Sequence, residues 1–402
     1  MSDERDQHSF PDPRAPTHPV LSPATFGFRE VVDTPSVLDV GSVVHVQSGR
    51  VAIAAILEDI GIGQGFSILL PAYHCPAMVE PVVSKSVRPI WYRIREDTSA
   101  DEEDIAARIE PSTRALMVVH YFGFPNDLTR VRQLCDDKGI LLIEDCSHTF
   151  FGEYAGRPVG SLGDYAFASS WKFFPIRDGG CLVSSRRVLS RLSTVSPSVA
   201  FQVKSGLNCL EVATQFHRFG PLGWILKAVF SNKDLVLALL KRARARKGGN
   251  HRPLGLDASL AESLPRQVVR ITVPSKWIFD HASRSRIVVK RRANYLALLQ
   301  STRTLPGCKP LFPALPEHVV PYVFPLLVDE PEEVFPLLKR RGVPIVRFGE
   351  FLWESVNRET FRLAADYSRR VFQFPCHQEM TEEELRWIIR EIGEVMNLVR
   401  RG

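Results

Sequence analysis

The sequence of 402 residues is poor in cysteine and has no long apolar run. Its seven cysteines are an odd number, are widely spaced and include no Cys-x-x-Cys pair, which argues against a disulfide framework and a zinc knuckle. The charged, proline-rich start lacks an apolar signal core, and no run of about 18 apolar residues follows. We therefore expect reduced thiols, a cytoplasmic location, and neither secretion nor a membrane span.

A single strongly basic stretch that dominates the chain is also missing. The net charge is +6, but lysine and arginine are spread along most of the sequence, whereas nucleic-acid-binding domains gather them on one face. The composition, 45% hydrophobic and 24% charged, is that of a globular protein with a substantial core. We expect small-molecule ligands and no nucleic-acid partner.

The first 25 residues contain five prolines, and this composition predicts a disordered or loosely attached arm. From Ser48 onward, apolar residues at helical spacing alternate with short apolar runs, as in "GRVAIAAILEDIG" followed by "FSILLP". Strands separated by helices of this length indicate right-handed crossovers and a mostly parallel sheet. Residues 26–265 are therefore predicted to form a large α/β domain with helices on both faces of the sheet.

Residues 266–402 read as a smaller α+β domain. It contains a long helix at "RIVVKRRANYLALLQ", strands at "VVPYVFPLLVD" and "VPIV", and a last helix in "MTEEELRWIIREIGEVMNLVRRG". Thr381 is the expected N-cap of that last helix, and Glu384 occupies the capping-box position.

An unusual segment at residues 200–263 interrupts the large domain. Residues 222–247 combine apolar, helix-like stretches with a basic cluster of Lys241, Arg242, Arg244, Arg246 and Lys247. An interfacial helix on anionic lipid would have this composition. An inserted helical hairpin with a solvated basic end also explains this composition, and we favour that interpretation.

Four loops should meet beyond the carboxyl ends of the strands, where doubly wound sheets bind ligands. In "QSGRVAIAAI", Ser48 and Gly49 open a helix whose free amides suit a phosphate. In "LLIEDCSHTF", Asp145 ends a strand and His148 follows three residues later. A shielded carboxylate stays ionised only beside a cation or several donors, such as a protonated pyridine nitrogen, although an Asp at this place can also cap a turn.

The third loop is "ASSWKFF", in which Lys172 lies just past a strand end. A partly desolvated lysine there can attack a carbonyl to form an imine, and the hydroxyls of Ser169 and Ser170 could bind phosphate. Taken alone, such a lysine is more often a surface charge.

The fourth loop, "PAYHCPAM", offers Tyr73 or His74 as residues that lie against a planar ring. A Cys75–His74 nucleophile and base pair is disfavoured because adjacent side chains point apart, and the same holds for Cys146 and His148.

The order of these motifs resembles the fold type I pyridoxal phosphate (PLP) enzymes, and among them the sugar aminotransferases of the DegT/DnrJ/StrS family. The resemblance is strong over residues 46–185, through "SGRVAIAAILEDIGIGQGFSILLPAY", "VVHYFGFPNDL" and "IEDCSHTFFGEYAGRPVGSLGDYAFASSWK". It is weaker in the C-terminal third, through "KRRANYLALL", "GVPIV" and "FQFPCHQEMTEEEL".

The resemblance implies a role for each matching residue. Lys172 would form the Schiff base with PLP and move protons, Asp145 would pair with the pyridinium, and His148 would lie near the phenolic oxygen of the ring. The phosphate would be bound by the region of Ser48, by the amides of Gly49 and Arg50, and by a hydroxyl of Ser169 or Ser170. No metal is implied.

The chain departs from the family pattern at three places in this region, one of them the spacing from Asp164 to Lys172, which is shorter than usual and leaves the phosphate-binding serine open. "RDGG" at residues 177–180 stands where Gly-Glu-Gly-Gly is usual, and Cys75 stands where an aromatic residue is usual. We expect substrate choice to begin to differ at "RDGG". No Asn-Arg segment that reaches a neighbouring subunit is found in the divergent residues 200–263.

The resemblance implies an aminotransferase that transfers an amino group, with glutamate as expected donor, to a nucleotide-linked keto sugar. Such sugars belong to cell-surface polysaccharide or natural-product biosynthesis. A homodimer is implied, and Arg347 is a candidate for binding a substrate anion. The alternatives are another PLP reaction, a non-sugar or lipid-linked substrate with peripheral membrane contact through residues 222–247, and a PLP-binding regulator without turnover.

Overall fold

The structure is a computed structural model that describes residues 10–28, 31–221, 223, 225, 226 and 267–401. The basic cluster and nearly all of the predicted membrane-contact segment at residues 222–247 lie outside the described residues. Both interpretations of that segment therefore stay predictions.

A seven-stranded mixed sheet forms the larger unit, in the order β1-β9-β8-β5-β4-β2-β3. The pairs among β2, β3, β4, β5 and β8 are parallel, whereas β9 runs antiparallel to both β1 and β8. The strands are β1 (Ser42–Val46), β2 (Ser67–Pro71), β3 (Arg88–Tyr92), β4 (Thr113–Val119), β5 (Leu141–Asp145), β8 (Tyr165–Ala168) and β9 (Gly180–Ser184). The predicted mostly parallel α/β sheet is confirmed.

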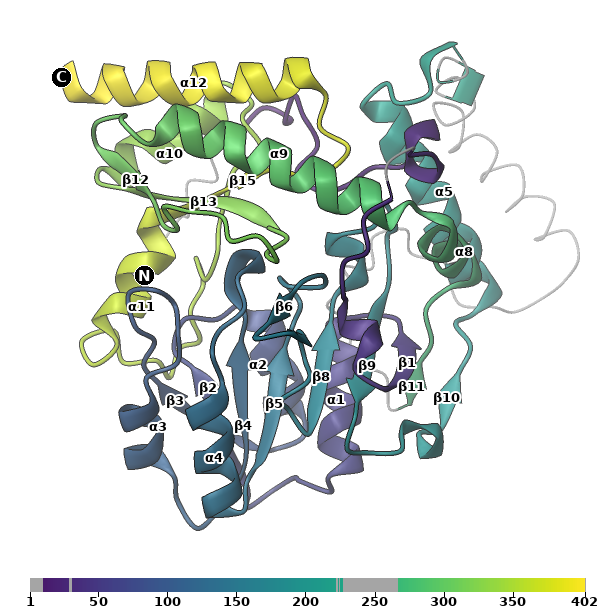
Figure 1. The fold of residues 1–402 in the computed structure, drawn as a ribbon, viewed down its shortest axis with the longest axis vertical. Coiled ribbons are helices and arrows are strands. Elements are labelled where there is room, and N and C mark those ends of the chain that lie inside the picture. The colour runs from purple at the N-terminus through teal and green to yellow at the C-terminus, as the bar shows by residue number, and fades with distance from the viewer. Residues whose placement is uncertain (1–9, 29–30, 222, 224, 227–266, 402) are drawn as a thin grey trace, which may run out of the picture.

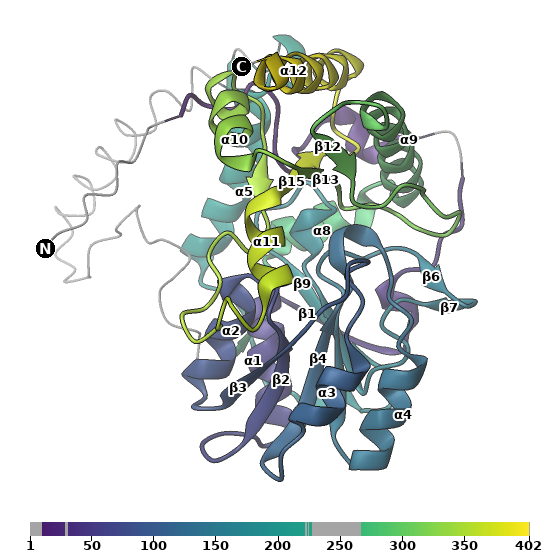
Figure 2. The same cartoon turned by 90° about the vertical axis from the view of Figure 1, so that its left-hand side faces the viewer.

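Helices cover both faces of this sheet, so its strands are apolar on both sides. Figure 2 shows α1 (Gly49–Asp59) and α2 (Pro76–Ser84) on one side, and α3 (Glu102–Arg108) and α4 (Thr129–Lys138) on the other. Successive residues of β4 alternate between the two cores: Met117 packs on the α1 side, and Leu116 on the α4 side. The same alternation decides which side chains of β5 face the site described below.

Short elements complete the larger unit. A hairpin of β6 (Glu153–Tyr154) and β7 (Arg157–Pro158) follows β5, and β10 (Thr194–Val195) pairs in parallel with β11 (Val268–Val269). Helix α5 (Val199–Gln215) packs on α8 (Val273–His281). The 3-10 helices are η1 (Pro23–Phe26), η2 (Val37–Asp39), η3 (Tyr121–Gly123), η4 (Ser170–Lys172) and η5 (Leu189–Arg191).

The C-terminal unit has a four-stranded antiparallel sheet, in the order β12-β13-β15-β14. Its elements are α9 (Arg284–Thr302), β12 (Cys308–Pro310), β13 (Val323–Val328), α10 (Pro331–Arg340), β14 (Val346–Arg347), α11 (Arg362–Arg370), β15 (Val371–Pro375) and α12 (Glu382–Arg401). Figure 1 places α9, α10 and α12 over this sheet, above the larger unit. The predicted capping box is present, because Glu384 N–H donates to Thr381 Oγ1 and Thr381 N–H to Glu384 Oε2.

The first part of the predicted C-terminal unit packs with the larger unit. Residues 267–281 were expected in the C-terminal unit, yet β11 pairs with β10 and α8 packs on α5, both of the larger unit. The boundary between residues 265 and 266 itself stays a prediction.

Residues 10–26 are packed against the C-terminal unit, and we call this segment the N-terminal strap. Ala15, Val20 and Leu21 are buried, and the Arg14 amide donates to the carbonyl of Gly342. The prediction of a loosely attached arm is wrong for residues 10–25, because apolar side chains between the prolines find a surface to cover. Residues 1–9 lie outside the description.

All seven cysteines are free thiols, as expected from their spacing. No described helix combines the length and the apolar character that crossing a membrane requires.

The unusual "RDGG" loop is fixed by its aspartate. Asp178 is buried and accepts hydrogen bonds from the hydroxyls of Ser205 and Ser275, both at 2.5 Å. It also accepts from the amide and the hydroxyl of Thr272, at 2.9 and 2.7 Å. The carboxylate thereby joins the loop to α5 and to the start of α8, so this departure from the family pattern has a structural function.

Replacing Asp178 with Asn should destabilise the protein by about 1–3 kcal/mol, because an amide NH₂ then faces donors and leaves buried groups unpaired. The free energy of unfolding in urea measures this effect. Asp280→Asn, in an exposed i,i+4 pair with Lys276 on α8, is the matched control and should change stability by less than about 0.5 kcal/mol. Equal effects of the two substitutions would contradict this account of the loop.

Candidate functional site

The predicted site residues gather at the carboxyl ends of parallel strands, next to the start of α1. Asp145 ends β5, His148 lies in the loop after it, and Lys172 lies in η4 directly after β8. The loop after β2 brings Cys75 into electrostatic contact with both Lys172 and Asp145. The crossover topology thus assembles residues that are far apart in the sequence, as expected for a doubly wound sheet.

Asp145 is a buried carboxylate with few partners. Its Oδ1 accepts a hydrogen bond of 2.8 Å from the amide of Ser147, and 6% of the residue is exposed. Burial raises the pKa of Asp145, while the charge of Lys172 and the hydrogen bonds from Ser147 oppose this rise. Among the described residues no ion pair involves Asp145. A bound cation would therefore stabilise the ionised form of this buried acid.

Lys172 is the cation that acts most strongly on Asp145. Burial lowers the pKa of Lys172, and its electrostatic interactions with Cys75 and Asp145 act in the opposite direction. Its Nζ lies 5.4 Å from the centroid of the Tyr322 ring. A lowered pKa increases the fraction of neutral amine, which is the nucleophilic form.

The backbone of Lys172 is held by Arg291, a residue that the sequence analysis did not single out. Arg291 is fully buried in α9, and its Nη2 donates to the carbonyl of Lys172 at 2.7 Å. Its other nitrogens donate to Gln378 Oε1 and to the carbonyls of Pro321 and Tyr322. The available signal was a cation within the apolar stripe of a helix, at the spacing of Ile287, Val288, Tyr295 and Leu298.

His148 is a neutral imidazole stacked on Tyr322. The ring centroids are 4.7 Å apart with an angle of 25° between the planes. Burial, followed by the charge of Lys172, lowers the pKa of His148 well below its usual value. Since its Nδ1 accepts from the amide of Phe122 at 3.4 Å, its proton lies on Nε2, which can donate a hydrogen bond.

A cradle of hydroxyls and amides lies at the start of α1. Ser48 caps the helix by accepting from the amide of Val51, and Ser169 donates to Ser147 across 3.3 Å. A Cβ at Gly49 would lie 2.8 Å from Ser169 Oγ and 3.6 Å from Ser147 Oγ. Only glycine permits this approach of helix and strand ends, which creates an anion-binding position of the kind found at helix N-termini.

The structure distinguishes among the serines and adds one that the sequence analysis missed. Ser169 faces the start of α1, whereas Ser170 Oγ is buried without a hydrogen-bond partner. Ser147, two residues after Asp145, joins the cradle through Ser169. The Arg50 side chain turns to Glu80 of α2, at 2.9 Å, so only its amide is placed for a ligand at the helix start.

Tyr73 and His74 have different environments. Tyr73 is fully buried and stacks on Tyr121, with ring centroids 5.3 Å apart. His74 stacks on Trp91, donates from Nδ1 to backbone carbonyls and accepts from the amide of Trp353 at Nε2. Both nitrogens of His74 thus have backbone partners, and its predicted place against a ligand ring stays a prediction.

Arg347 is also placed differently from its prediction. Its guanidinium lies 4.2 Å from the Phe335 ring centroid and donates to the carbonyl of Pro331, both in α10. The neighbouring Phe348 is the residue that faces the site, with ring contacts to Tyr73 and His148. The chain alternates here and directs Arg347 toward α10, and the binding of a substrate anion by Arg347 stays a prediction.

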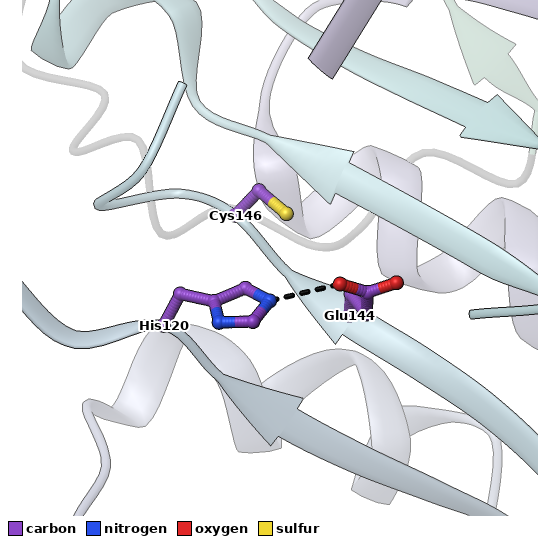
Figure 3. A group of neighbouring side chains, drawn as sticks. All are labelled: His120, Glu144 and Cys146. Carbon is purple, nitrogen blue, oxygen red and sulfur yellow. Dashed lines mark hydrogen bonds and ion pairs between the residues drawn. The ribbon is translucent and has the colours of Figure 1, made fainter. Parts of the chain in front are cut away.

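The other face of β5 carries a second polar group that the sequence analysis missed. His120 Nε2 donates to Glu144 at 2.9 Å, and Cys146 lies beside them (Figure 3). Glu144 also accepts from the amides of Gly160 and Gly163, and His120 Nδ1 accepts from the amide of Asn126. These bonds tie β4, β5 and the β7–β8 loop together beside a cavity of about 330 Å³.

The comparisons with known proteins agree with this geometry. Residues 35–192 match the DegT/DnrJ/EryC1/StrS aminotransferase family. This part of the chain, about two fifths of its length, is thus similar to the family. A curated relative, the L-glutamine:2-deoxy-scyllo-inosose aminotransferase of Streptomyces kanamyceticus, is 33% identical over 152 residues, which are 37% of this chain and 35% of the relative. The GDP-perosamine synthase of Vibrio cholerae is 31% identical over 150 residues, 36% of this chain and 40% of that protein.

The sequence match thus spans well under half the length of these two relatives, while the fold match is more extensive. The aminotransferase TlmJ of Streptoalloteichus hindustanus has a TM-score of 0.63 and 19% identity, and the match covers 89% of this chain and 86% of TlmJ. The PLP form of the sugar aminotransferase Spr1654 of Streptococcus pneumoniae has a TM-score of 0.62 and 16% identity, with coverage of 89% and 87%. The fold shared with these two structures therefore extends across both units.

Lys172 should react with amine reagents at lower pH than an exposed lysine does, because burial lowers its pKa and preserves the neutral amine. Reductive methylation with ¹³C-formaldehyde, followed by NMR across a pH series, gives the titration of each amine. Lys138, exposed at the end of α4, is the internal reference. Identical pH profiles for Lys172 and Lys138 would refute the perturbed amine.

Arg291→Lys should lower the free energy of unfolding by about 2–3 kcal/mol, because a single ammonium cannot replace the four hydrogen bonds of the guanidinium. Chemical denaturation measures this loss. Arg292→Lys is the matched control in the next position of α9, where a partly buried guanidinium binds the carbonyls of Pro316 and Val319. If Arg292→Lys lowers the free energy of unfolding as much as Arg291→Lys does, the contact with Lys172 makes no contribution to stability.

Proposed function

We propose that the protein is a PLP-dependent aminotransferase that transfers an amino group to a keto sugar. One observation carries this proposal. Asp145, a buried acid with no ion pair among the described residues, lies near the desolvated Lys172, and both lie beside an anion-binding position at the start of α1. Support for a sugar comes from the relatives, whose names are those of an inosose aminotransferase and of GDP-perosamine synthase. We infer a nucleotide-linked keto sugar of polysaccharide or natural-product biosynthesis, with glutamate as donor.

The residues of this chain fit the three polar parts of PLP. The buried carboxylate of Asp145 lacks an ion-pair partner among the described residues, as a partner for a pyridinium should. The hydroxyls of Ser147 and Ser169 and the amides at Gly49 and Arg50 surround a position suited to a phosphate. His148 offers its Nε2–H from beside Tyr322, which suits the phenolic oxygen of the ring.

When bound, PLP supplies an electron-accepting ring that stabilises negative charge on the substrate carbon. Asp145, kept from water by burial, would hold a protonated ring nitrogen by charge and so orient the ring. The α1 amides and the serines fix the opposite end. Lys172 would hold the cofactor through its Nζ, and the same nitrogen, partly neutral because burial lowers the pKa of Lys172, would take up and return a proton. Arg291 keeps the Lys172 backbone in place during these steps.

Two further properties follow from the proposal as expectations. The protein should act as a homodimer and in the cytoplasm. Sedimentation of the purified protein with and without PLP measures the first, and fractionation of cells measures the second.

The purified protein should bind PLP and give, after borohydride reduction, a stable adduct on the peptide that contains Lys172. Lys172→Ala should abolish this adduct, whereas the control Lys138→Ala should retain it. Peptide mass spectrometry identifies the modified residue. A protein that takes up no PLP would overturn the proposed function, and an undiminished adduct in Lys172→Ala would overturn the assignment of the lysine.

Glutamate should convert bound PLP to its amine form, pyridoxamine phosphate (PMP), as followed by absorbance, and a nucleotide-linked keto sugar should restore the original spectrum. Glutamine, which appears in the name of the Streptomyces kanamyceticus relative, is the second donor to compare. Loss of substrate ammonia without formation of PMP would instead identify an eliminating enzyme.

A further inference from the structure

The chain directly after Lys172 is held by two side chains of the C-terminal unit. Lys172 ends η4, a 3-10 helix of three residues, and the last carbonyls of a helix need donors from elsewhere. Arg291 Nη2 donates to the carbonyl of Lys172 at 2.7 Å, and Gln378 Nε2 donates to the carbonyl of Phe173 at 2.8 Å. Because peptide groups are planar, holding these two consecutive carbonyls fixes the direction in which the chain leaves Lys172.

Gln378 joins these two hydrogen bonds into one unit. Its Oε1 accepts from Arg291 Nε at 3.0 Å, so the same side chain accepts from Arg291 and donates to Phe173. The guanidinium of Arg291 in turn lies 4.4 Å from the centroid of the Phe173 ring. Gln378 is 2% exposed, and its neutral amide provides the donor and the acceptor that this buried position requires.

The residues on either side of this glutamine bind the N-terminal strap. His377 Nδ1 accepts from the amide of Glu379 at 3.3 Å, so its proton lies on Nε2, which donates to the carbonyl of Pro16 at 2.9 Å. The Glu379 carboxylate accepts from Ser22 Oγ at 2.7 Å and from Thr25 Oγ1 at 3.3 Å. Both residues of this loop are buried, so the strap helps to determine where the loop between β15 and α12 lies.

The strap also contacts the Lys172 loop directly. The His18 ring packs edge-on against Trp171, the residue before Lys172, with the ring centroids 4.7 Å apart and the planes at 82°. The hydrogen bonds of Pro16 and Ser22 to the loop after β15 lie on either side of His18 in the sequence and hold it there. The chain is thus restrained before Lys172 by the strap and after it by the bonds to the two following carbonyls.

We propose that Gln378 is a positioning residue for Lys172, and that the N-terminal strap keeps Gln378 in place by binding the residues on either side of it. This inference rests on the proposed function, because it concerns how the Lys172 amine is presented to PLP. Gln378 acts through Phe173 and Arg291. Without its amide, the chain after Lys172 is free to change direction, and the amine gains contact with water.

Gln378→Met tests the proposal, because methionine has a similar length and no charge but makes neither hydrogen bond. The full-length protein without PLP is methylated reductively with ¹³C-formaldehyde, and NMR gives the pH titration of Lys172 with Lys138 as reference. The titration of Lys172 should move toward that of Lys138, since a displaced loop reduces the burial that lowers the pKa of Lys172. The dissociation constant of PLP should rise about fivefold, the effect of losing one hydrogen bond.

Gln373→Met is the matched control. Gln373 is a buried glutamine in the middle of β15, opposite Pro325 and Val346 of the same sheet. This variant should retain the wild-type titration of Lys172 and the wild-type PLP affinity, even where its melting temperature falls as far as that of Gln378→Met. Wild-type values of both quantities for Gln378→Met, or equal changes in the two variants, would overturn the proposal.

Ser22→Ala tests the contribution of the strap, because it removes a hydrogen bond to Glu379 without touching Gln378. Both measurements should change in the same direction as for Gln378→Met, and by less, since the other contacts of the strap remain. Ser36→Ala is the control, because both serines are N-caps of 3-10 helices and donate to a carboxylate, but Ser36 donates to Asp39 in its own turn.

Two other results have separate meanings. Wild-type behaviour of Ser22→Ala would overturn the role of the strap. Absence of PLP uptake by the wild type would overturn the proposed function, whereas the titration of Lys172, measured without PLP, would still decide whether Gln378 positions this lysine.

Discussion

The buried guanidinium of Arg291 is the interaction on which the arrangement of the site depends. It lies in α9 of the C-terminal unit, yet it donates to the carbonyl of Lys172, which follows β8 of the larger unit. Burial lowers its pKa to about 10, so it remains charged at neutral pH. Burying a charge with only neutral acceptors is costly, and here four hydrogen bonds from Arg291 to protein oxygens offset that cost. The two units must therefore pack in one relative position for Arg291 to make its hydrogen bond to Lys172.

The second constraint is the alternation of side chains along β5. Glu144 and Asp145 are adjacent carboxylates, but the pleat directs them to opposite faces of the sheet. Glu144 receives hydrogen bonds from His120 and from two loop amides, which make it a structural residue. Asp145 receives one amide bond and has no cation partner among the described residues, which leaves its charge available. One strand thus supplies a structural acid to one layer and a ligand-binding acid to the other.

These constraints explain how far the sequence could predict the site. Lys172, Asp145 and Ser48 could be found because each lies next to a strand or helix end, and topology alone brings such ends together. Arg291 acts through Lys172, more than a hundred positions away in the sequence, so no local pattern reveals it. His74 and Arg347 were assigned to ligands because of their residue types, but their partners, Trp353 and Pro331, lie in segments whose packing the sequence pattern does not give. The strap was misjudged because proline content was weighed above Ala15, Val20 and Leu21, which supply its buried apolar contacts.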